Sequence, residues 1–190
     1  TSGSIRFKGQ EIVGLPPQRI CHKGIARTFQ IPRPFRKLQL LENVAVSAFF
    51  GSSEPISREE AWKRAKEVLK IVNLSGDSGV NVDRLGAAGL KKLELARALA
   101  TRPRLLLADE SLGGLDEAEM EQAADMLEQI RSMMGITIIW VEHIMGVLMK
   151  VVDRVIVLDH GEKISEGLPT EVTIDPKVVE VYLGENYEGG

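Results

Sequence analysis

Strand-like and helix-like spacings of apolar residues alternate along the first part of the chain. Residues 4–7 alternate between polar and apolar positions and predict a short strand, and residues 18–23 predict a short helix. Residues 24–30 then predict a strand that ends in polar side chains. Pro32 and Pro34 end this first segment, because proline interrupts regular backbone hydrogen bonding.

Helical spacing dominates the middle of the chain. Residues 40–50 predict one helix, and Ser57 with Glu60 three positions later has the spacing of a cap for the next helix. The apolar face of this second helix would consist of Trp62, Ala65, Leu69 and Val72. We expect Trp62 to pack in that face rather than to stack on a ligand. Residues 90–100 predict a third helix.

The last third of the chain returns to strands. Three apolar runs predict strands buried on both faces, at residues 104–108, 136–141 and 154–158. Between the first two runs, Asp116 can cap a helix and Gly135 can end it. The alternation of strands and helices predicts an α/β fold, interrupted by a helical insert at about residues 35–90.

Length and composition limit the classes of protein to consider. The 190 residues are 44% hydrophobic and 27% charged, which is ordinary for a globular domain with a sizeable core. The formal net charge of -3 argues against a nucleic-acid partner, which usually requires a basic surplus. Cys21 is the single cysteine, so no internal disulfide can form, and we expect an unreactive thiol. No stretch reaches the roughly 18 apolar residues of a membrane span.

Two adjacent carboxylates, Asp109 and Glu110, stand where the apolar run 104–108 ends. Ligands of open α/β sheets bind at this carboxyl edge of the strands. A carboxylate there can hold Mg2+, directly or through water, and its neighbour can orient or deprotonate an attacking water. Many strands also end in acidic residues that only confer solubility, so the pair alone leaves both interpretations open.

Two other predicted strands end in side chains that suit the same chemistry. Gln30 ends one of them, and its amide can contact a hydrated metal and a water at once because it both donates and accepts. His143 follows the strand 136–141 and can change charge near neutral pH or contact a phosphate. Taken singly, Gln30 is more typical of a surface side chain and His143 of a structural histidine.

A further candidate lies at residues 85–99, where a small-residue loop leads into a helix. Free backbone N–H groups and the helix dipole make such an N-terminus attractive to anions. Any helix that follows a glycine-containing loop has a similar pattern, so this segment alone does not establish a site.

In their order along the chain, these features resemble the nucleotide-binding subunits of ABC transporters over essentially the whole length. The matching motifs are Gln30 in the Q-loop, residues 85–89 in the signature loop, 105–110 in the Walker B strand, 113–116 in the D-loop and His143 as the switch histidine. Other segments are similar to the subunits that drive import of branched-chain amino acids, including ARTFQIPRPF at 26–35, LELARALATRP at 93–103 and YLGE at 182–185.

The resemblance implies a P-loop NTPase-like α/β core with an inserted helical subdomain, incomplete at the N-terminus. The core would comprise residues 1–34 and 91–190, and the helical signature subdomain residues 35–90. ATP and Mg2+ would bind. Transmembrane permease subunits and a second ABC ATPase subunit, identical or different, would be the partners. The protein would be cytoplasmic and peripheral on the inner face of the cell membrane.

The resemblance also implies a role for each matching residue. Glu110 would be the general base, Asp109 would hold Mg2+ through water, and Gln30 would contact the metal and sense the γ-phosphate. His143 would stabilise the γ-phosphate, and residues 34–44 would face the membrane partner. The residues that would contact ATP across the dimer are Gly86, Ala87, Ala88, Gly89 and Asp116.

Two departures from the family pattern bear on activity. The phosphate loop G-x-x-x-x-G-K-[ST] does not occur in these residues, and we expect it upstream of Thr1, so this chain alone should bind ATP poorly. The missing strand and helix would leave apolar sheet surface exposed. Residues 85–89 read LGAAG instead of LSGGQ, and Ala88 would oppose a positive φ. The alternative is a non-catalytic family member that binds a partner and regulates assembly.

Overall fold

The computed structural model describes residues 2–74, 80–110, 114–143 and 145–183. The chain divides into two compact units, residues 1–143 and residues 144–190. The helical subdomain expected at residues 35–90 lies inside the first unit, and its separation from the core stays a prediction. Among the helices that the structure describes, none is long and apolar enough to cross a membrane.

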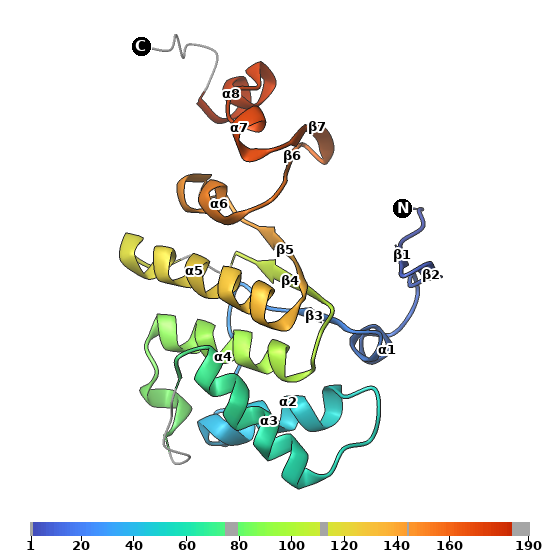
Figure 1. The fold of residues 1–190 in the computed structure, drawn as a ribbon, viewed down its shortest axis with the longest axis vertical. Coiled ribbons are helices and arrows are strands. Elements are labelled where there is room, and N and C mark those ends of the chain that lie inside the picture. The colour runs from blue at the N-terminus through green and yellow to red at the C-terminus, as the bar shows by residue number, and fades with distance from the viewer. Residues whose placement is uncertain (1, 75–79, 111–113, 144, 184–190) are drawn as a thin grey trace. The chain divides into compact units, whose positions relative to one another are not determined.

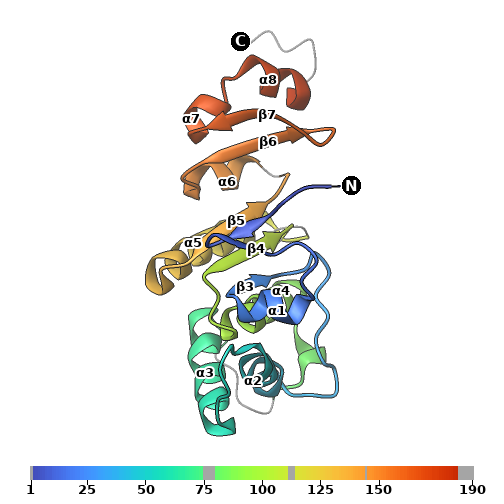
Figure 2. The same ribbon diagram turned by 90° about the vertical axis from the view of Figure 1, so that its right-hand side faces the viewer.

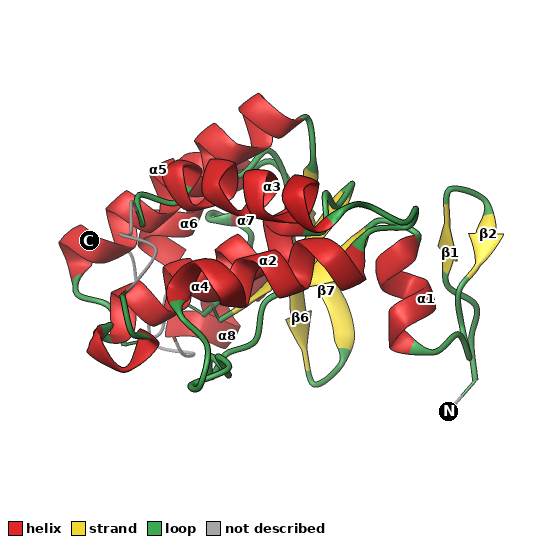
Figure 3. Ribbon diagram, turned by 90° about the horizontal axis from the view of Figure 1, so that it is seen from below, coloured by secondary structure: helices red, strands yellow, loops and turns green. Residues whose placement is uncertain are grey.

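The first unit contains a hairpin, a parallel sheet and several helices. Its elements are β1 (Arg6–Phe7), β2 (Gln10–Glu11), α1 (Pro17–His22), β3 (Ile25–Arg27), α2 (Leu40–Gly51), α3 (Arg58–Ile71), the 3-10 helix η1 (Val82–Arg84), α4 (Ala87–Ala100), β4 (Leu105–Asp109), α5 (Glu117–Met134) and β5 (Thr137–Val141). Figure 3 shows the antiparallel hairpin of β1 and β2 close to α1. Most of these elements agree with the predicted ones, but β2 and η1 were not predicted, β3 is shorter than expected and α4 begins before residue 90.

Strands β3, β4 and β5 form one parallel sheet in that order. The register pairs Leu106 of β4 with Ala26 of β3 on one side and with Ile138 of β5 on the other. Helices α4 and α5 lie on the same face of the sheet, as Figure 1 and Figure 2 show. Because the strands are parallel, their carboxyl ends share one edge of the sheet and their amino ends share the opposite edge.

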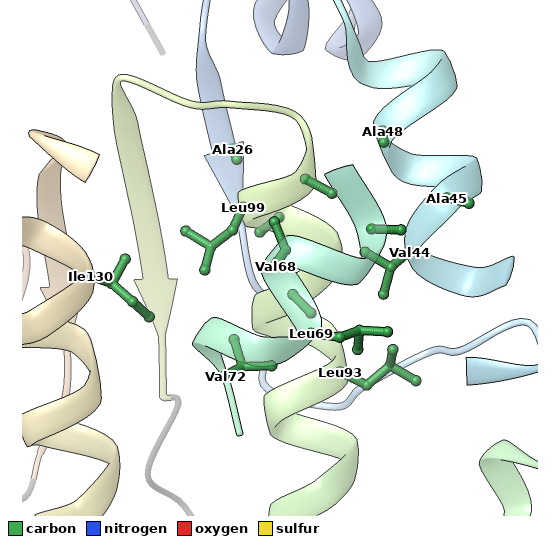
Figure 4. Packing of buried hydrophobic residues seen from close by; sticks show 14 of the residues in the cluster. Ala26, Val44, Ala45, Ala48, Val68, Leu69, Val72, Leu93, Leu99 and Ile130 are labelled. Carbon is green, nitrogen blue, oxygen red and sulfur yellow. The ribbon is translucent and has the colours of Figure 1, made fainter. Parts of the chain in front are cut away.

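The hydrophobic core extends from this covered face of the sheet into the helical segment. Leu106 of β4, Leu99 of α4, Ile130 of α5 and Val44 of α2 are fully buried in the same cluster, part of which Figure 4 shows. Full burial of one such side chain stabilises a fold by about 1.5–3 kcal/mol. One continuous cluster therefore holds α2, α3 and α4 against the strands that carry the candidate site.

The ends of α3 and α5 follow local sequence signals. The hydroxyl of Ser57 accepts a hydrogen bond from the backbone N–H of Glu60 at 3.1 Å, which confirms the predicted cap of α3. Gly135 ends α5 in the left-handed conformation with φ 61°, where glycine avoids the strain of a Cβ atom. Both helix boundaries were therefore readable from the sequence.

The predicted packing of Trp62 is wrong. Its side chain is 39% exposed, and the buried side of α3 consists of Ala61, Arg64, Ala65, Val68 and Leu69. Ala61 and Val68 lie at the centre of the buried stripe. Trp62 is displaced from Ala61 by one residue, or about 100° around the helix, which places it at the margin.

The strands of the sheet differ in burial: Ile25 and Ala26 of β3 are both buried, whereas β5 is exposed on one face. On the face that the helices cover, Leu106 and Ala108 are 0% and 1% exposed, whereas Ile139 and Val141 on the opposite face are 52% and 57% exposed. The expectation that residues 136–141 form a strand buried on both faces is therefore wrong. The expected exposure of apolar sheet surface is present, since successive strand side chains point to opposite faces.

The second unit has its own small core. It comprises α6 (Met145–Val151), β6 (Val155–Asp159), β7 (Glu162–Gly167), α7 (Pro169–Val172) and α8 (Pro176–Leu183). Strands β6 and β7 form an antiparallel hairpin. Val155, Val157 and Val172 are buried together, but Ile156 and Leu158 on the other face of β6 are exposed. The expected burial of residues 154–158 on both faces is also wrong.

Candidate active site

The carboxyl end of the sheet carries the predicted acidic pair. Asp109 is the last residue of β4, and its neighbour Val141 is the last residue of β5. Glu110 follows, and its backbone N–H donates to the carbonyl of Val141 at 2.9 Å. Glu110 has φ 43°, a left-handed backbone conformation that is uncommon for a residue with a side chain. Such strained positions often occur at functional sites.

Gln30 lies beside Glu110, although 80 positions separate the two residues. The Nε2 group of Gln30 donates a hydrogen bond to Oε2 of Glu110. Residues 28–30 leave the carboxyl end of β3, and β3 is the direct neighbour of β4, so the parallel register brings the two side chains to one edge. This contact unites two of the predicted site residues.

Arg27 forms an ion pair with the carboxylate of Asp109. The sequence did not indicate this contact. Its Nη2 group lies 2.6 Å from Oδ2 of Asp109, and its guanidinium lies 5.1 Å above the ring of Phe29. The backbone N–H of Asp109 donates to Oγ1 of Thr28 at 3.3 Å. In the register, Arg27 of β3 lies beside Leu107 of β4. Asp109 follows Leu107 by two residues, so Arg27 and Asp109 lie on the same face of the sheet. Strand alternation is the signal that could have found this contact.

Lys91 of α4 is a second residue that sequence reasoning did not single out. Its Nζ group donates to the backbone carbonyl of Glu110 at 3.1 Å. Burial lowers the pKa of the Lys91 ammonium, and the charges of Glu142 and Glu110 oppose that shift. Lys91 therefore ties α4 to the acidic strand end and adds positive charge there.

His143 is placed less closely than the other predicted residues. It lies two positions beyond β5 and is exposed. Among the described residues, none of the hydrogen bonds of Asp109, Glu110 and Gln30 reaches it. The structure thus brings Asp109, Glu110 and Gln30 together and puts His143 near the same sheet edge through its position in the chain.

The small-residue segment at 85–89 is mostly the first turn of α4 rather than a loop. Gly86 is the residue that precedes the helix, and Ala87, Ala88 and Gly89 are helical. The expected strain at Ala88 does not arise, because its φ is not positive. A Cβ atom on Gly89 would lie 3.2 Å from the Leu85 side chain, so this turn is tightly packed. The first turn contains no acidic residue that would neutralise its free N–H groups.

Asp116 has a local structural partner. Its Oδ1 atom accepts from the backbone N–H of Glu119 at 2.8 Å, and Oε2 of Glu119 accepts from the N–H of Asp116 at 3.1 Å. This reciprocal pair caps α5. Residues 111–113, which include the predicted Gly113, lie outside the described residues.

A cavity of about 100 Å3 connects the beginnings of α4 and α5 with the end of β3. Its lining includes Phe29, Ala88, Lys91, Glu94 and Leu115. Burial raises the pKa of the Glu94 carboxyl, and the nearby Arg97 opposes that shift. The cavity brings the predicted signature segment and the start of α5 next to the segment that leads to Gln30.

Comparison with known proteins places this fold in the class of ATP-binding cassettes. The profile of the family described as "ABC transporter" matches residues 1–113, and the chain therefore belongs to the ABC transporter family. A second profile, described as "Branched-chain amino acid ATP-binding cassette transporter", matches residues 162–188. The membership groups the chain with ABC-type ATPases.

Individual relatives agree with this assignment. The chain is 32% identical to the high-affinity branched-chain amino acid transport ATP-binding protein BraF of Pseudomonas aeruginosa, over 97% of this chain and 77% of BraF. The crystal structure of MJ1267, an ATP-binding cassette in its ADP conformation, is 28% identical with a TM-score of 0.83, over 97% of this chain and 78% of that one. The dimeric cassette MJ0796 bound to ADP and Pi is 27% identical with a TM-score of 0.77, over 89% and 74%. The predicted fold class and family are confirmed.

Proposed function

We propose that this chain is the ATP-binding and ATP-hydrolysing subunit of an importer of branched-chain amino acids. The contact of Gln30 with Glu110, beside Asp109 at the carboxyl end of parallel strands, is the observation that carries the proposal. The name of BraF and the profile match at residues 162–188 support the solute class. Transmembrane permease subunits would hold the protein at the inner face of the membrane.

Glu110 would act as the general base for the attacking water. Its carboxylate already accepts a hydrogen bond from the Gln30 amide, which fixes one oxygen and orients the other. The amide oxygen of Gln30 can accept from the same water or contact the metal. His143, at the end of the next strand, would donate to the γ-phosphate.

The residues at this strand end suit Mg2+ held together with a nucleotide. Asp109 already attracts the cationic Arg27, and proteins commonly bind Mg2+ through one or two carboxylates plus substrate phosphates. Among the described residues no group of three or more His, Cys, Asp or Glu could hold a metal alone, so ATP oxygens would complete the site. Asp109, through water, and Gln30 would be the protein contacts. When bound, Mg2+ neutralises charge on the phosphate oxygens.

A second ABC ATPase subunit, identical or different, would complete each ATP site. The N-terminal turn of α4, from Gly86 to Gly89, offers free N–H groups to phosphates held by that subunit. Asp116 would act across the same dimer. The dimeric state of the MJ0796 cassette supports this arrangement.

The segment at residues 34–44 would contact the permease and transmit the stroke. Arg97 of α4 donates to the carbonyl of Arg33 at 2.9 Å and lies 5.0 Å above the ring of Phe35. A movement that the nucleotide causes at the start of α4 would therefore be transmitted to residues 34–44 through the side chain of Arg97. The division between a core and a helical subdomain at residues 35–90 belongs to this proposal.

The 190 residues should bind ATP poorly because they contain no G-x-x-x-x-G-K-[ST] loop. The test therefore uses this sequence fused behind a segment that carries the loop, taken from an ABC relative, with ATP hydrolysis as the measurement. Glu110→Gln should lower the rate by about 10²- to 10⁴-fold, because the amide cannot accept the proton. Glu128→Gln, at an exposed position of α5, is the matched control and should leave the rate unchanged.

Two outcomes would contradict parts of this proposal. Full hydrolysis by the Glu110→Gln protein would remove the assigned base. An inactive fusion protein that still binds the permease would favour the alternative, a non-catalytic regulator of assembly. Uptake of labelled leucine, compared with a labelled cationic amino acid, tests the solute class in reconstituted transporters.

A further inference from the structure

A second cavity, of about 360 Å3, lies at the opposite edge of the sheet, where β3 and β4 begin. The hairpin β1–β2, α1 and the ends of α2 and α4 surround it. The backbone of Gly24, just before β3, accepts hydrogen bonds from the N–H groups of Arg104 and Leu105 at 2.7 Å and 3.0 Å. The cavity therefore has a floor built from the hydrogen-bonded starts of two strands, and its size is within the range of small-molecule sites.

Four cationic side chains line this cavity: Lys8, Lys23, Arg102 and Arg104. No carboxylate among the described residues is part of the lining. The carboxylate that pairs with Arg102, that of Glu60, is shared, since its Oε1 atom lies 3.6 Å from Arg102 and 3.7 Å from Arg64. The cavity therefore has an excess of positive charge, although the whole chain has a formal net charge of -3.

The buried Arg64 shows how concentrated this charge is. Its side chain is 5% exposed, and burial lowers the pKa of its guanidinium, with a further lowering by the charge of Arg102. Its Nε atom has no hydrogen-bond partner. The Glu60 carboxylate is thus shared by the guanidinium groups of Arg64 and Arg102. Arg102 and Arg104 therefore retain positive charge with which a ligand in the cavity can interact.

Two of the lining cations stand at backbone positions that normally favour glycine or asparagine. Lys8 has φ 50° in the two-residue turn between β1 and β2, and Arg102 has φ 54° immediately after the end of α4. Asparagine and glycine are the usual residues in such turns and helix ends because other side chains are strained there. Strain at two cationic positions of one cavity points to a use for their charges.

We propose that this cavity binds a small anion that carries more than one phosphate charge. Guanidinium groups match phosphate oxygens with two parallel hydrogen bonds, and ammonium groups add point charges. Such a phosphate group can belong to a free polyphosphate or to a lipid headgroup. The site is at the amino edge of the sheet, so it is separate from Asp109 and Glu110 and does not depend on the proposed ATPase function.

The first experiment measures binding of pyrophosphate to the full chain by calorimetry in EDTA, which excludes a metal-dependent contribution from the acidic edge. A parallel arm measures co-sedimentation with vesicles that contain phosphatidic acid, whose phosphate monoester can carry two charges, and with phosphatidylcholine vesicles. Binding of pyrophosphate assigns a free polyphosphate, and selective binding of the phosphatidic acid vesicles assigns a headgroup. Absence of both would overturn the proposal.

The double variant Lys8→Asn/Arg102→Asn tests the site itself. Asparagine tolerates the left-handed backbone, so the variant should unfold at a temperature equal to or higher than the wild type, while anion binding should weaken at least about tenfold. The control Lys63→Asn/Lys66→Asn removes two exposed cations of α3 that do not line the cavity and should keep the affinity. Equal affinity in both double variants would overturn the proposal.

A second double variant tests whether the loss of anion binding results only from a change in the hairpin β1–β2. Lys23→Gln/Arg104→Gln retains polar side chains of similar reach and should also weaken binding at least about tenfold. His160→Asn removes left-handed strain in the second unit, where φ is 46°, and should change stability without changing the affinity. Loss of binding in the His160→Asn protein would contradict the assigned site.

Discussion

The two edges of the same parallel sheet carry opposite charges. At the carboxyl edge, Asp109, Glu110 and Gln30 form an acidic tip, whereas the amino edge opens into a cavity lined by cations such as Arg104. Residues 105–108 of β4, which run between the two edges, are apolar. The difference shows that the residues at the strand ends and in the adjoining loops decide the chemistry of each edge, while the parallel register decides which of them meet.

The two edges also differ in how their charges are balanced. Arg27 and Lys91 approach the acidic tip directly, at 2.6 Å from the Asp109 carboxylate and 3.1 Å from the Glu110 carbonyl. At the amino edge, Arg102 lies 3.6 Å from the carboxylate of Glu60, which also pairs with the buried Arg64 at 3.7 Å. The acidic edge is therefore partly neutralised within the chain, and the basic edge is left with excess charge for an outside partner.

The largest expected effect on stability comes from a cavity in the core at β4, the strand that runs from one edge of the sheet to the other. Leu106→Ala removes a side chain that is 0% exposed at the centre of β4 and should lower the free energy of unfolding by about 2–5 kcal/mol, measured by urea denaturation. Leu158→Ala, at a position that is 62% exposed, is the control and should stay within about 0.5 kcal/mol. A loss below about 1 kcal/mol for Leu106→Ala would show that β4 is not the common support.

A smaller effect should follow from distorting the basic edge alone. A Cβ atom at Gly51, which lines the cation-rich cavity, would lie 2.4 Å from Cγ2 of Thr101, so Gly51→Ala should cost about 1–3 kcal/mol in thermal or urea unfolding. Adding Thr101→Ser removes Cγ2 and should restore part of that loss. Gly146→Ala, where nothing lies within 4 Å, is the control and should be neutral or stabilising. Equal losses in both alanine variants would refute the steric explanation.

Removing the internal cation of the acidic edge should have a still smaller effect on stability. The side chains of Arg27 and Asp109 are 54% and 32% exposed, so Arg27→Gln should cost at most about 1 kcal/mol, and that cost should diminish in 1 M salt as screening weakens the pair. Urea denaturation at low and high salt measures both. A loss above about 2 kcal/mol would mean that the pair is a main support of this edge.

The smallest expected effect concerns the thiol at the basic edge. Burial raises the pKa of Cys21, because the thiolate is poorly solvated there, so less thiolate exists at pH 8 than for a free cysteine. Alkylation by iodoacetamide should be slower than in the urea-unfolded chain, and its rate should rise with pH around a midpoint above that of the unfolded chain. A midpoint below the unfolded value would show that the neighbouring cations outweigh burial.

The order of motifs was the most informative property of the sequence. The family was indicated by the sequence order of Gln30, the segment at 85–89, the pair Asp109 and Glu110, and His143. The profile match confirms the family. Caps such as Ser57 were also predictable, because they depend on residues only three positions apart. Neither prediction required knowledge of which distant segments meet.

Predictions of burial were less successful. Trp62 was assigned to the apolar face of its helix but is 39% exposed, and β5 was expected to be buried on both faces although Ile139 is 52% exposed. Apolar spacing shows which positions could be buried. It does not show which surfaces have a neighbour to bury them, because that depends on how the layers pack.

By itself, the sequence determined the family, the α/β class, the main helix boundaries and the candidate residues of the acidic edge, since motifs and short-range patterns encode these directly. Only the tertiary structure decided that Arg27 pairs with Asp109, that Lys91 reaches Glu110 and that cations from residues 8 to 104 line one cavity. These contacts depend on strand register and on packing between segments far apart in the chain. Local periodicity contains no record of either.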